Sequence, residues 1–231
     1  MHNLIELPAW ERLFKRIVWT QLGEVRGKRI LDFGSGEGIT ANHFANGNFV
    51  VAIEPSEDAL ANRWEDYEYI QIIGDEHCLS ELEDYSFDMI ICHNVLEYID
   101  DKVQVINEFH RILKIGGTLS LVKHNRASRV MQMAVLLDNI KKAHDLLDGH
   151  DSTAIKYGTI RYYEDNDITN WNAGLKLLNT YGIRTFFDLQ QNQEKHATEE
   201  WQDQMMQLEL RVSKLDEYKN IAFFHHLIFI K

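Results

Sequence analysis

The stretch LDFGSGEGIT, residues 31–40, decides how this chain is expected to fold. It places glycine at positions 34, 36 and 38 in a chain of 231 residues that has only 13 glycines. Glycine is favoured where the backbone needs a positive φ or must come very close to a ligand. The preceding segment KRILDF is short, apolar and β-prone, and the following segment ITANHFA is compatible with a helix. We therefore predict a strand, a glycine turn and a helix, which together point backbone N–H groups at a bound ligand.

Beyond this turn, β-prone runs alternate with helix-compatible segments through the first half of the chain. Strands that alternate with helices form parallel βαβ units. An unbroken apolar run such as MIIC, residues 89–92, suits a strand that is buried on both faces. The expected strands are 28–34, 49–54, 69–74, 87–93 and 118–124, and the expected helices are 37–46, 56–65 and 101–114.

The second half of the chain departs from this alternation. A helix is expected from Asp167 to Asn179, and a polar helix at about 194–218 separates two strongly β-prone segments, 183–189 and 221–230. These late strands leave no room for another parallel crossover, so they indicate an antiparallel edge pair.

The predicted fold class is therefore α/β, with a doubly wound, Rossmann-like sheet. The sheet has seven mostly parallel strands and an antiparallel last strand. We expect one domain, residues 1–231, with a helical or irregular insertion at about 126–165 that covers the active face.

Charge and hydropathy exclude several classes of protein. Lys and Arg number 24 against 36 Asp and Glu, and the net charge of −12 argues against generic binding to polyanions. The charge is uneven, because Phe109 to Leu137 contains no acid and five basic residues. No apolar stretch approaches the ~18 residues of a membrane span, and the N-terminus lacks the pattern of a signal peptide. A cytoplasmic protein without a metal site is expected.

The spacing of the glycines indicates which nucleotide the turn accepts. A dinucleotide site requires G-x-G-x-x-G, but Ile39 stands at the sixth position here. Asp32, Gly34, Gly36 and Gly38 instead form D-x-G-x-G-x-G, which resembles the first motif of S-adenosyl-L-methionine (SAM)-dependent methyltransferases. SAM carries an ammonium and a sulfonium group rather than a pyrophosphate, and an acid at position 32 suits these cations.

Further acids follow the next two strands. Glu54 ends the second strand, where it is expected to accept hydrogen bonds from ribose hydroxyls. Asp75 and Glu76 follow the third strand and are candidates for the adenine edge and its amino group. Taken alone, each of these acids is more simply a solvated loop residue. Acids at the ends of the first three strands, at Asp32, Glu54 and Asp75–Glu76, together predict a SAM site.

Later segments resemble one group of class I methyltransferases, the bacterial tRNA 5-carboxymethoxyuridine methyltransferases. SFDMIICHNVLEYIDD and RILKIGGTLSL continue the general class I match over the fourth and fifth strands. The segments that are similar to the tRNA enzymes are HNVLEYI (93–99), GGTLSLVKHN (116–125), YGIRTFFDL (181–189) and LELRVSKLDEYKNIAFFHHLIFI (208–230). The resemblance implies SAM as methyl donor and tRNA as partner, with methylation of the carboxylate of a modified wobble uridine.

The same resemblance implies roles for individual residues. Gly34 and Ser35 would contact SAM from the glycine turn, Glu54 would bind the ribose, and His93 would lie near the ligand. Asp75 and Glu76 would lie beside adenine. In the family, an arginine of the N-terminal helix binds SAM, and Phe14 aligns with that arginine here. A neighbouring basic residue would have to take its place. Arg12, Lys15 and Arg16 are available, and Arg16 is our candidate.

The acceptor determines which side chains the chemistry needs. A carboxylate is ionised at neutral pH and needs orientation rather than a base, for which a guanidinium fork is suited. Arg184 is the candidate for this role, and the alternative is an arginine that pairs with Asp188 or solvent. His93 would serve as a base for a phenol or thiol, or would simply line the SAM pocket.

The end of the fifth strand supplies the remaining candidates. Lys123 and Asn125 are expected to contact the acceptor, and their alternatives are a solvated lysine and a cap of the next element. His225 and His226 are neighbours in a strand and therefore point to opposite faces. Two other functions remain open: a small-molecule O- or N-methyltransferase, and a SAM-binding module without catalysis.

Overall fold

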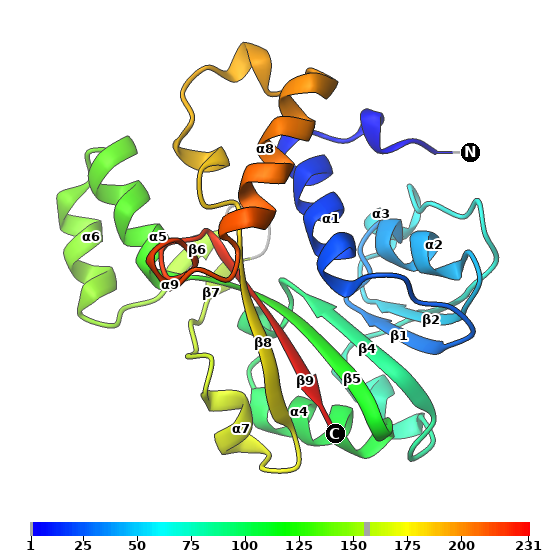
Figure 1. Ribbon diagram of the computed structural model, residues 1–231. Helices are drawn as coiled ribbons and strands as arrows, with labels where there is room; N and C mark the ends of the chain where they lie inside the picture. Colours follow the sequence, from blue (N-terminus) through cyan, green and yellow to red (C-terminus); the bar gives the residue numbers. More distant parts are fainter. Residues whose placement is uncertain (1, 155–157) are drawn as a thin grey trace.

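The computed structural model describes residues 2–154 and 158–231 and confirms the predicted α/β sheet (Figure 1). Its seven strands are ordered β3-β2-β1-β4-β5-β9-β8. The first five pair in parallel, and β9 is antiparallel to both of its neighbours. The strands are β1 (Arg29–Phe33), β2 (Phe49–Glu54), β3 (Ile70–Ile73), β4 (Phe87–His93), β5 (Leu113–His124), β8 (Lys176–Ile183) and β9 (Phe224–Ile230).

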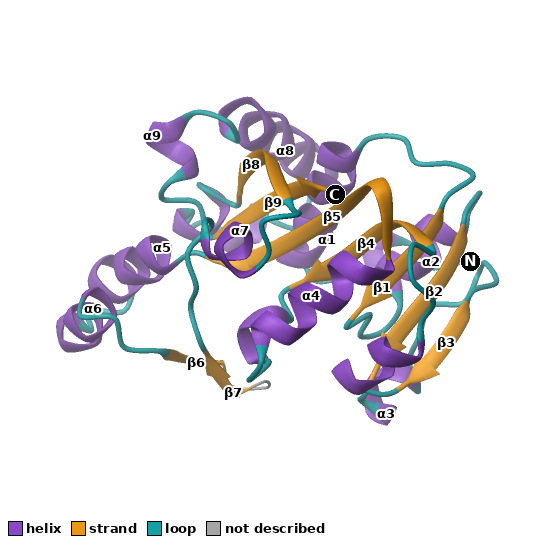
Figure 2. Cartoon of the chain, turned by 90° about the horizontal axis from the view of Figure 1, so that it is seen from below, coloured by secondary structure: helices purple, strands orange, loops and turns teal. Residues whose placement is uncertain are grey.

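Helices cover both faces of the sheet. The helices are α1 (Ala9–Leu22), α2 (Ile39–Ala45), α3 (Glu57–Leu60), α4 (Lys102–Ile112), α5 (Arg126–Met131), α6 (Ile140–Leu147), α7 (Asp167–Trp171), α8 (Glu199–Val212) and α9 (Asp216–Lys219). On one face α1 and α8 lie side by side (Figure 1), and α4 and α7 lie on the other (Figure 2). Within the described ranges, none of the helices combines the length and the apolar composition that a membrane span requires.

Alternation along β5 explains how the two helical layers share one sheet. Leu119 and Leu121 pack with Phe109 of α4 on one face. Val122 packs with Leu13 of α1 on the other face. Successive side chains of a strand point to opposite faces, so a central strand with both faces apolar is buried on both sides.

The segment that follows β5 forms a separate small unit. It comprises α5, the π-helical turn Gln132–Leu136 and α6, and then a hairpin of β6 (Ser152–Ala154) and β7 (Gly158–Ile160). Met133, Ala143 and Leu146 form its own apolar cluster. Figure 2 shows α5 and α6 extending away from the sheet. Residues 155–157 of the predicted insertion lie outside the described residues.

Two sequence predictions in the second half were wrong. The helix expected to run to Asn179 ends at Trp171, where Asn172 Oδ1 accepts from the Gly174 N–H at 2.9 Å and forms a tight turn. The strand expected at 183–189 is instead β8, which pairs with β9 from Lys176 to Ile183. Pairing with the apolar β9 overrides the helical appearance of KLLNTYGI.

Three smaller differences concern the ends of elements. The polar helix expected at about 194–218 is broken into α8 and α9, and β9 begins at Phe224 rather than at 221. The fifth strand begins five residues earlier than expected, because Leu113 pairs with Phe87 before a register shift. These differences leave the carboxyl edge of the sheet as expected.

Candidate active site

The glycine turn after β1 has the backbone that its sequence requires. Gly34, Gly36 and Gly38 have φ values of 75°, 56° and 69°, a region that residues with a Cβ avoid. A Cβ on Gly34 would overlap the side chain of Val95, which follows β4, whereas a Cβ on Gly36 would meet open space. The turn therefore packs against its neighbour at Gly34 and leaves the approach to Gly36 open.

Glu54, at the end of β2, holds this turn in place. Its two carboxylate oxygens accept from the N–H groups of Gly36 at 2.8 Å and Ser56 at 2.9 Å. The Gly34 and Ser35 N–H groups donate to the Ile53 carbonyl at 2.9 and 3.1 Å. The carboxylate of Glu54 therefore lies against the turn, and it retains lone pairs for ligand hydroxyl groups.

Asp32 and Ser35 present buried polar atoms that lack protein partners. Asp32 Oδ2 and Ser35 Oγ are both buried and have no hydrogen-bond partner in the described part of the chain. Burial raises the pKa of Asp32 to about 6, although the Lys15 ammonium opposes the shift. Unsatisfied buried polar atoms are costly, so these two atoms are available to a polar ligand, and the Asp32 carboxylate favours a cationic group.

Lys15, rather than Arg16, is the base of α1 that faces this turn, which corrects the prediction of Arg16. The Arg16 guanidinium pairs with Asp203 of α8 at 2.6 Å, because residues 12 and 16 share the face of α1 that packs on α8. Lys15 Nζ donates to Thr40 Oγ1 of α2 at 2.8 Å. Desolvation lowers the pKa of Lys15, and Glu11 and Asp32 are among the acids that oppose this.

The candidates after β3 are more open. Asp75 is exposed, and its Oδ1 accepts from the His77 N–H at 3.0 Å as the cap of the 3-10 turn Glu76–Glu81. Glu76 is half-buried as the first residue of that turn. Both lie beside the end of β2, since β2 and β3 pair in parallel. Their contact with adenine stays a prediction.

His93, at the end of β4, belongs to a hydrogen-bond chain that the sequence analysis did not identify. His93 Nε2 contacts Ser120 Oγ at 2.8 Å, Ser120 Oγ contacts His226 Nε2 at 2.8 Å, and His226 Nδ1 contacts Gln21 Oε1 at 2.7 Å. Gln21 Oε1 only accepts, so His226 Nδ1 carries the proton, Ser120 donates to His226, and His93 Nε2 donates to Ser120. His93 Nδ1 is left as an acceptor.

Both imidazoles in this chain are neutral. Burial lowers the pKa of His93 well below its usual value, and His226 and Lys15 lower it further. Burial also lowers the pKa of His226 to about 3. A base with so low a pKa removes a phenolic proton poorly. The arrangement therefore favours His93 as a lining residue over His93 as a base.

Arg184 lies at the same carboxyl edge as the glycine turn. Ile183 of β8 and His124 of β5 both pair with Phe224 of β9, which brings these strand ends together. Arg184 has a φ of 61° and is 7% exposed. Its Nε and one terminal nitrogen donate to Asp188, so the ion pair expected as the alternative to an acceptor contact is present. Its guanidinium carbon lies within 5.4 Å of the centroids of four rings, those of Trp10, Phe187, Phe223 and Phe224.

Lys123 and Asn125 have structural roles, and we do not retain their predicted contact with the acceptor. Lys123 Nζ pairs with Asp165 Oδ1 at 2.8 Å, and His225 Nδ1 approaches Asp165 Oδ2 at 2.9 Å. Asn125 Nδ2 donates to two carbonyl oxygens in the loop before β9, and its Oδ1 caps α5. The opposite orientations of His225 and His226 are confirmed, although both side chains are buried.

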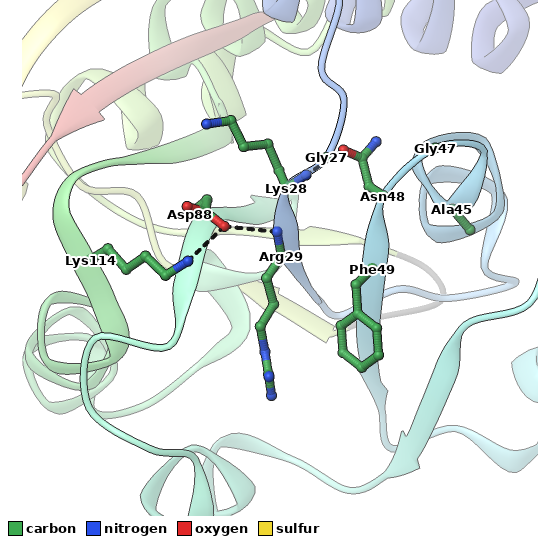
Figure 3. Close-up of a pocket in the computed structure, with 9 residues that line it drawn as sticks. All are labelled: Gly27, Lys28, Arg29, Ala45, Gly47, Asn48, Phe49, Asp88 and Lys114. Carbon is green, nitrogen blue, oxygen red and sulfur yellow. Dashed lines mark hydrogen bonds and ion pairs between the residues drawn. The ribbon is translucent and has the colours of Figure 1, made fainter.

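The opposite edge of the sheet carries a separate pocket (Figure 3). Arg29 and Phe49, which begin β1 and β2, line it together with Asp88 and Lys114. Asp88 Oδ2 accepts from Lys114 Nζ and from the Arg29 N–H, both at 2.9 Å. Since Asp32 and Glu54 lie near or at the other ends of β1 and β2, this pocket is separate from the candidate site. In the described ranges, no group of three or more His, Cys, Asp or Glu could hold a metal.

The strand order and the polar turn at the carboxyl edge define a class I methyltransferase fold. Residues 31–121 match the family model described as a methyltransferase domain. The protein is accordingly a SAM-dependent methyltransferase, and SAM is its methyl donor.

Individual relatives agree with this class. The chain is 28% identical over 171 residues to the ubiquinone biosynthesis O-methyltransferase of Salmonella newport, covering 64% of this chain and 70% of that protein. The SAM-dependent methyltransferase structure from Mesorhizobium loti is similar with a TM-score of 0.59 at 18% identity, covering 99% and 100% of the two chains. The structure from Aquifex aeolicus has a TM-score of 0.57 at 13% identity and covers both chains fully.

The residues at the turn fit SAM. The orphaned Asp32 Oδ2 suits its ammonium group, and the open space at Gly36 allows the nucleoside to approach the backbone. Glu54 would accept from the ribose hydroxyls, and Lys15 would face the carboxylate. When bound, SAM supplies a methyl group on a positively charged sulfur.

Substitution of Glu54 by alanine is expected to raise the SAM dissociation constant by about tenfold or more. A charge-assisted hydrogen bond contributes ~1.5–3 kcal/mol, and the Gly36 N–H also loses its acceptor. Isothermal titration calorimetry measures the change. Glu57→Ala, in the first turn of α3, is the matched control and should bind SAM normally. Equal affinities of the two variants would exclude Glu54 from the site.

Lys15→Met is expected to weaken SAM binding by about tenfold, whereas Arg16→Met should not. The first change removes a cation that faces Asp32 and Thr40, and the second removes only an ion pair with the exposed Asp203. Competition binding with S-adenosylhomocysteine and with adenosine checks the assignment. Only the ligand that carries the amino-acid group should lose affinity in Lys15→Met, and an equal loss for adenosine would contradict it.

Proposed function

We propose that the protein transfers the SAM methyl group to a carboxylate oxygen, and that the acceptor is 5-carboxymethoxyuridine at the wobble position of tRNA. One observation carries the first part: the carboxyl edge combines an oriented guanidinium with a histidine of strongly lowered pKa. Arg184 is held by Asp188 and by four aromatic rings. His93 is neutral because burial lowers its pKa.

Such a site suits an acceptor that is already an anion. Methyl transfer from a sulfonium is an in-line displacement, so the site mainly has to position the two reactants. A carboxylate oxygen forms the new bond to the methyl carbon while the carbon–sulfur bond breaks, and no proton is removed. Arg184 has one terminal nitrogen without a partner among the described residues, and it would orient the carboxylate. His93 Nδ1 would accept a hydrogen bond from the ligands.

The identity of the acceptor rests on the resemblance to the tRNA enzymes. YGIRTFFDL contains Arg184, and LELRVSKLDEYKNIAFFHHLIFI contains the buried Glu209 and β9. Glu209 accepts from the backbone immediately after Arg184, at Thr185. That the two similar segments meet at the proposed clamp supports an acceptor of the same chemistry.

A small-molecule O-methyltransferase is the second candidate. The similarity to the ubiquinone biosynthesis O-methyltransferase favours it. Methylation of a phenol would require a base at the carboxyl edge, and the lowered pKa of His93 makes this residue a weak one. A SAM-binding module without catalysis would bind SAM and show no methyl transfer to any acceptor.

Methylation with labelled SAM separates these candidates. The purified protein is offered tRNA that carries 5-carboxymethoxyuridine, the same tRNA with unmodified uridine, and a panel of phenols. Mass spectrometry of the digested nucleosides should show a new methyl ester only in the first sample. Mild alkali should release the label as methanol, because esters hydrolyse and aryl ethers do not. A base-stable product on the phenols alone would favour the second candidate.

A further inference from the structure

The turn that carries Arg184 has an unusual anchor. Arg184 lies in the left-handed region, which a residue with a long side chain adopts at a cost. The next three N–H groups then point to one carboxylate, that of Glu209 on α8. The N–H of Thr185 reaches Oε2 at 2.7 Å, and those of Phe186 and Phe187 reach Oε1 at 2.8 and 3.1 Å. Successive N–H groups around one anion form a backbone nest.

Among the described residues, the carboxylate in this nest is bound by backbone N–H groups and by no side chain. Glu209 is 0% exposed, and no cation within the described residues forms an ion pair with it. Burial raises the pKa of Glu209, and the three backbone hydrogen bonds oppose the shift. A buried carboxylate without a cation is costly, and here its compensation comes from the N–H groups of the turn.

The nest is connected to the guanidinium through a short helix. The 3-10 turn Phe187–Leu189 begins within the segment that Glu209 binds. This turn carries Asp188, which accepts from the Arg184 Nε at 2.9 Å. Helix termini have N–H groups without intrahelical partners, and Glu209 satisfies them here from a distant helix. Glu209 is therefore linked to Asp188 through the backbone of residues 185–187, and Asp188 in turn binds the Arg184 guanidinium.

We propose that Glu209 is a positioning residue for the acceptor: it fixes the Arg184 turn from α8 and so sets the orientation of the guanidinium that binds a carboxylate. This inference rests on the proposed function of Arg184. It adds a residue that touches neither SAM nor acceptor and that acts on the acceptor alone. It also gives α8 a role at the site, although α8 lies outside the matched methyltransferase domain.

Glu209→Gln tests the inference, because the amide keeps the shape of the side chain and replaces one acceptor by a donor. We expect the KM for the carboxylate acceptor to rise about tenfold, consistent with the loss of one charge-assisted hydrogen bond, and the SAM dissociation constant to stay within about twofold. In ¹⁵N–¹H spectra, the amide protons of Thr185, Phe186 and Phe187 should shift upfield. Glu200→Gln, an exposed position of the same helix, should change neither readout.

A destabilised control separates positioning from general loss of packing. Val212→Ala removes buried methyl groups from α8 and should lower the melting temperature without raising the acceptor KM. The double variant of Arg184→Ala and Glu209→Gln should be no worse than Arg184→Ala, since both act through one guanidinium. Additive losses, or a Glu209→Gln variant that behaves as Val212→Ala does, would overturn the inference alone. An unaffected Arg184→Ala would overturn the proposed function and the inference together.

Discussion

Replacing Arg184 by alanine is expected to lower kcat/KM for a carboxylate acceptor by about ten- to a hundredfold. A hydrogen bond to a charged group contributes ~1.5–3 kcal/mol, which corresponds to this range. The SAM dissociation constant should stay within about twofold, because β4, β5 and β9 lie between β8, which leads to Arg184, and β1. The glycine turn and Glu54, which are expected to hold the nucleoside, lie at the ends of β1 and β2. Initial rates with labelled SAM and calorimetric titration measure the two quantities independently.

Two further variants make this result interpretable. Arg184→Ala leaves the Asp188 carboxylate, only 15% exposed, without its partner, so the melting temperature should also fall. Arg184→Lys keeps the charge but not the fork, and should show the loss of turnover with a smaller loss of stability. Arg16→Ala, which breaks the exposed pair with Asp203, is the activity control. Loss of SAM binding in Arg184→Ala would contradict the assignment to the acceptor.

Replacing Asp32 by asparagine is expected to weaken SAM binding by about tenfold or more and to remove its pH dependence. Asp32 has a pKa of about 6, raised by burial, and its ionised form is expected to attract the ammonium group of SAM. In the unaltered protein, SAM affinity should therefore be constant above about pH 7 and should fall towards tenfold per pH unit below about pH 6. Titrations from pH 5 to 8 on both proteins measure this difference.

Asp32→Asn, which should weaken SAM binding, should at the same time raise the stability of the ligand-free protein. A raised carboxyl pKa means that Asp32 favours the folded state below the unfolded value, and that this contribution is lost as pH rises through about 6. The shift from 3.8 to about 6 corresponds to about 3 kcal/mol at most. The ligand-free Asp32→Asn protein should therefore melt higher than the unaltered protein at pH 7.5.

Asp88→Asn is the matched control for Asp32. Asp88 lies at the opposite edge of the sheet, where it binds Lys114 and the Arg29 N–H (Figure 3). Desolvation opposes the shift, but these two partners hold the pKa of Asp88 below its usual value. The variant should keep the SAM affinity and the pH profile of the unaltered protein. A flat profile in the unaltered protein, or the same profile in Asp32→Asn, would show that another group binds the cation.

The prediction of the SAM end of the site depended on local backbone requirements. Gly34, Gly36 and Gly38 have positive φ values, which glycine adopts at little cost. Glycines between a predicted strand and a predicted helix therefore indicate such a turn from the sequence alone. Asp32 and Glu54 lie near or at strand ends, and parallel strands bring their carboxyl ends to one edge. The order of these residues along the chain was therefore sufficient to bring them together.

The acceptor end was less predictable, because its side chains are determined by partners far away in the sequence. Lys123 forms an ion pair with Asp165, and Asn125 hydrogen-bonds to the loop before β9. A polar side chain at a strand end was therefore not always free to bind the acceptor. Lys15 and Arg16 are neighbours on α1, and only the position of α8 decides that Arg16 faces Asp203. No local pattern distinguishes these outcomes.

By itself, the sequence determined the sheet of alternating strands and helices, the glycine turn and the acids that follow the first strands, since these depend on short-range periodicity and on the φ angles open to glycine. Only the tertiary structure decided which polar side chains remain free for a ligand. Burial and long-range pairing set the pKa values of His93 and Asp32, and they place Glu209 against the Arg184 turn. These effects depend on which surfaces pack together, and a residue's local sequence does not contain that information.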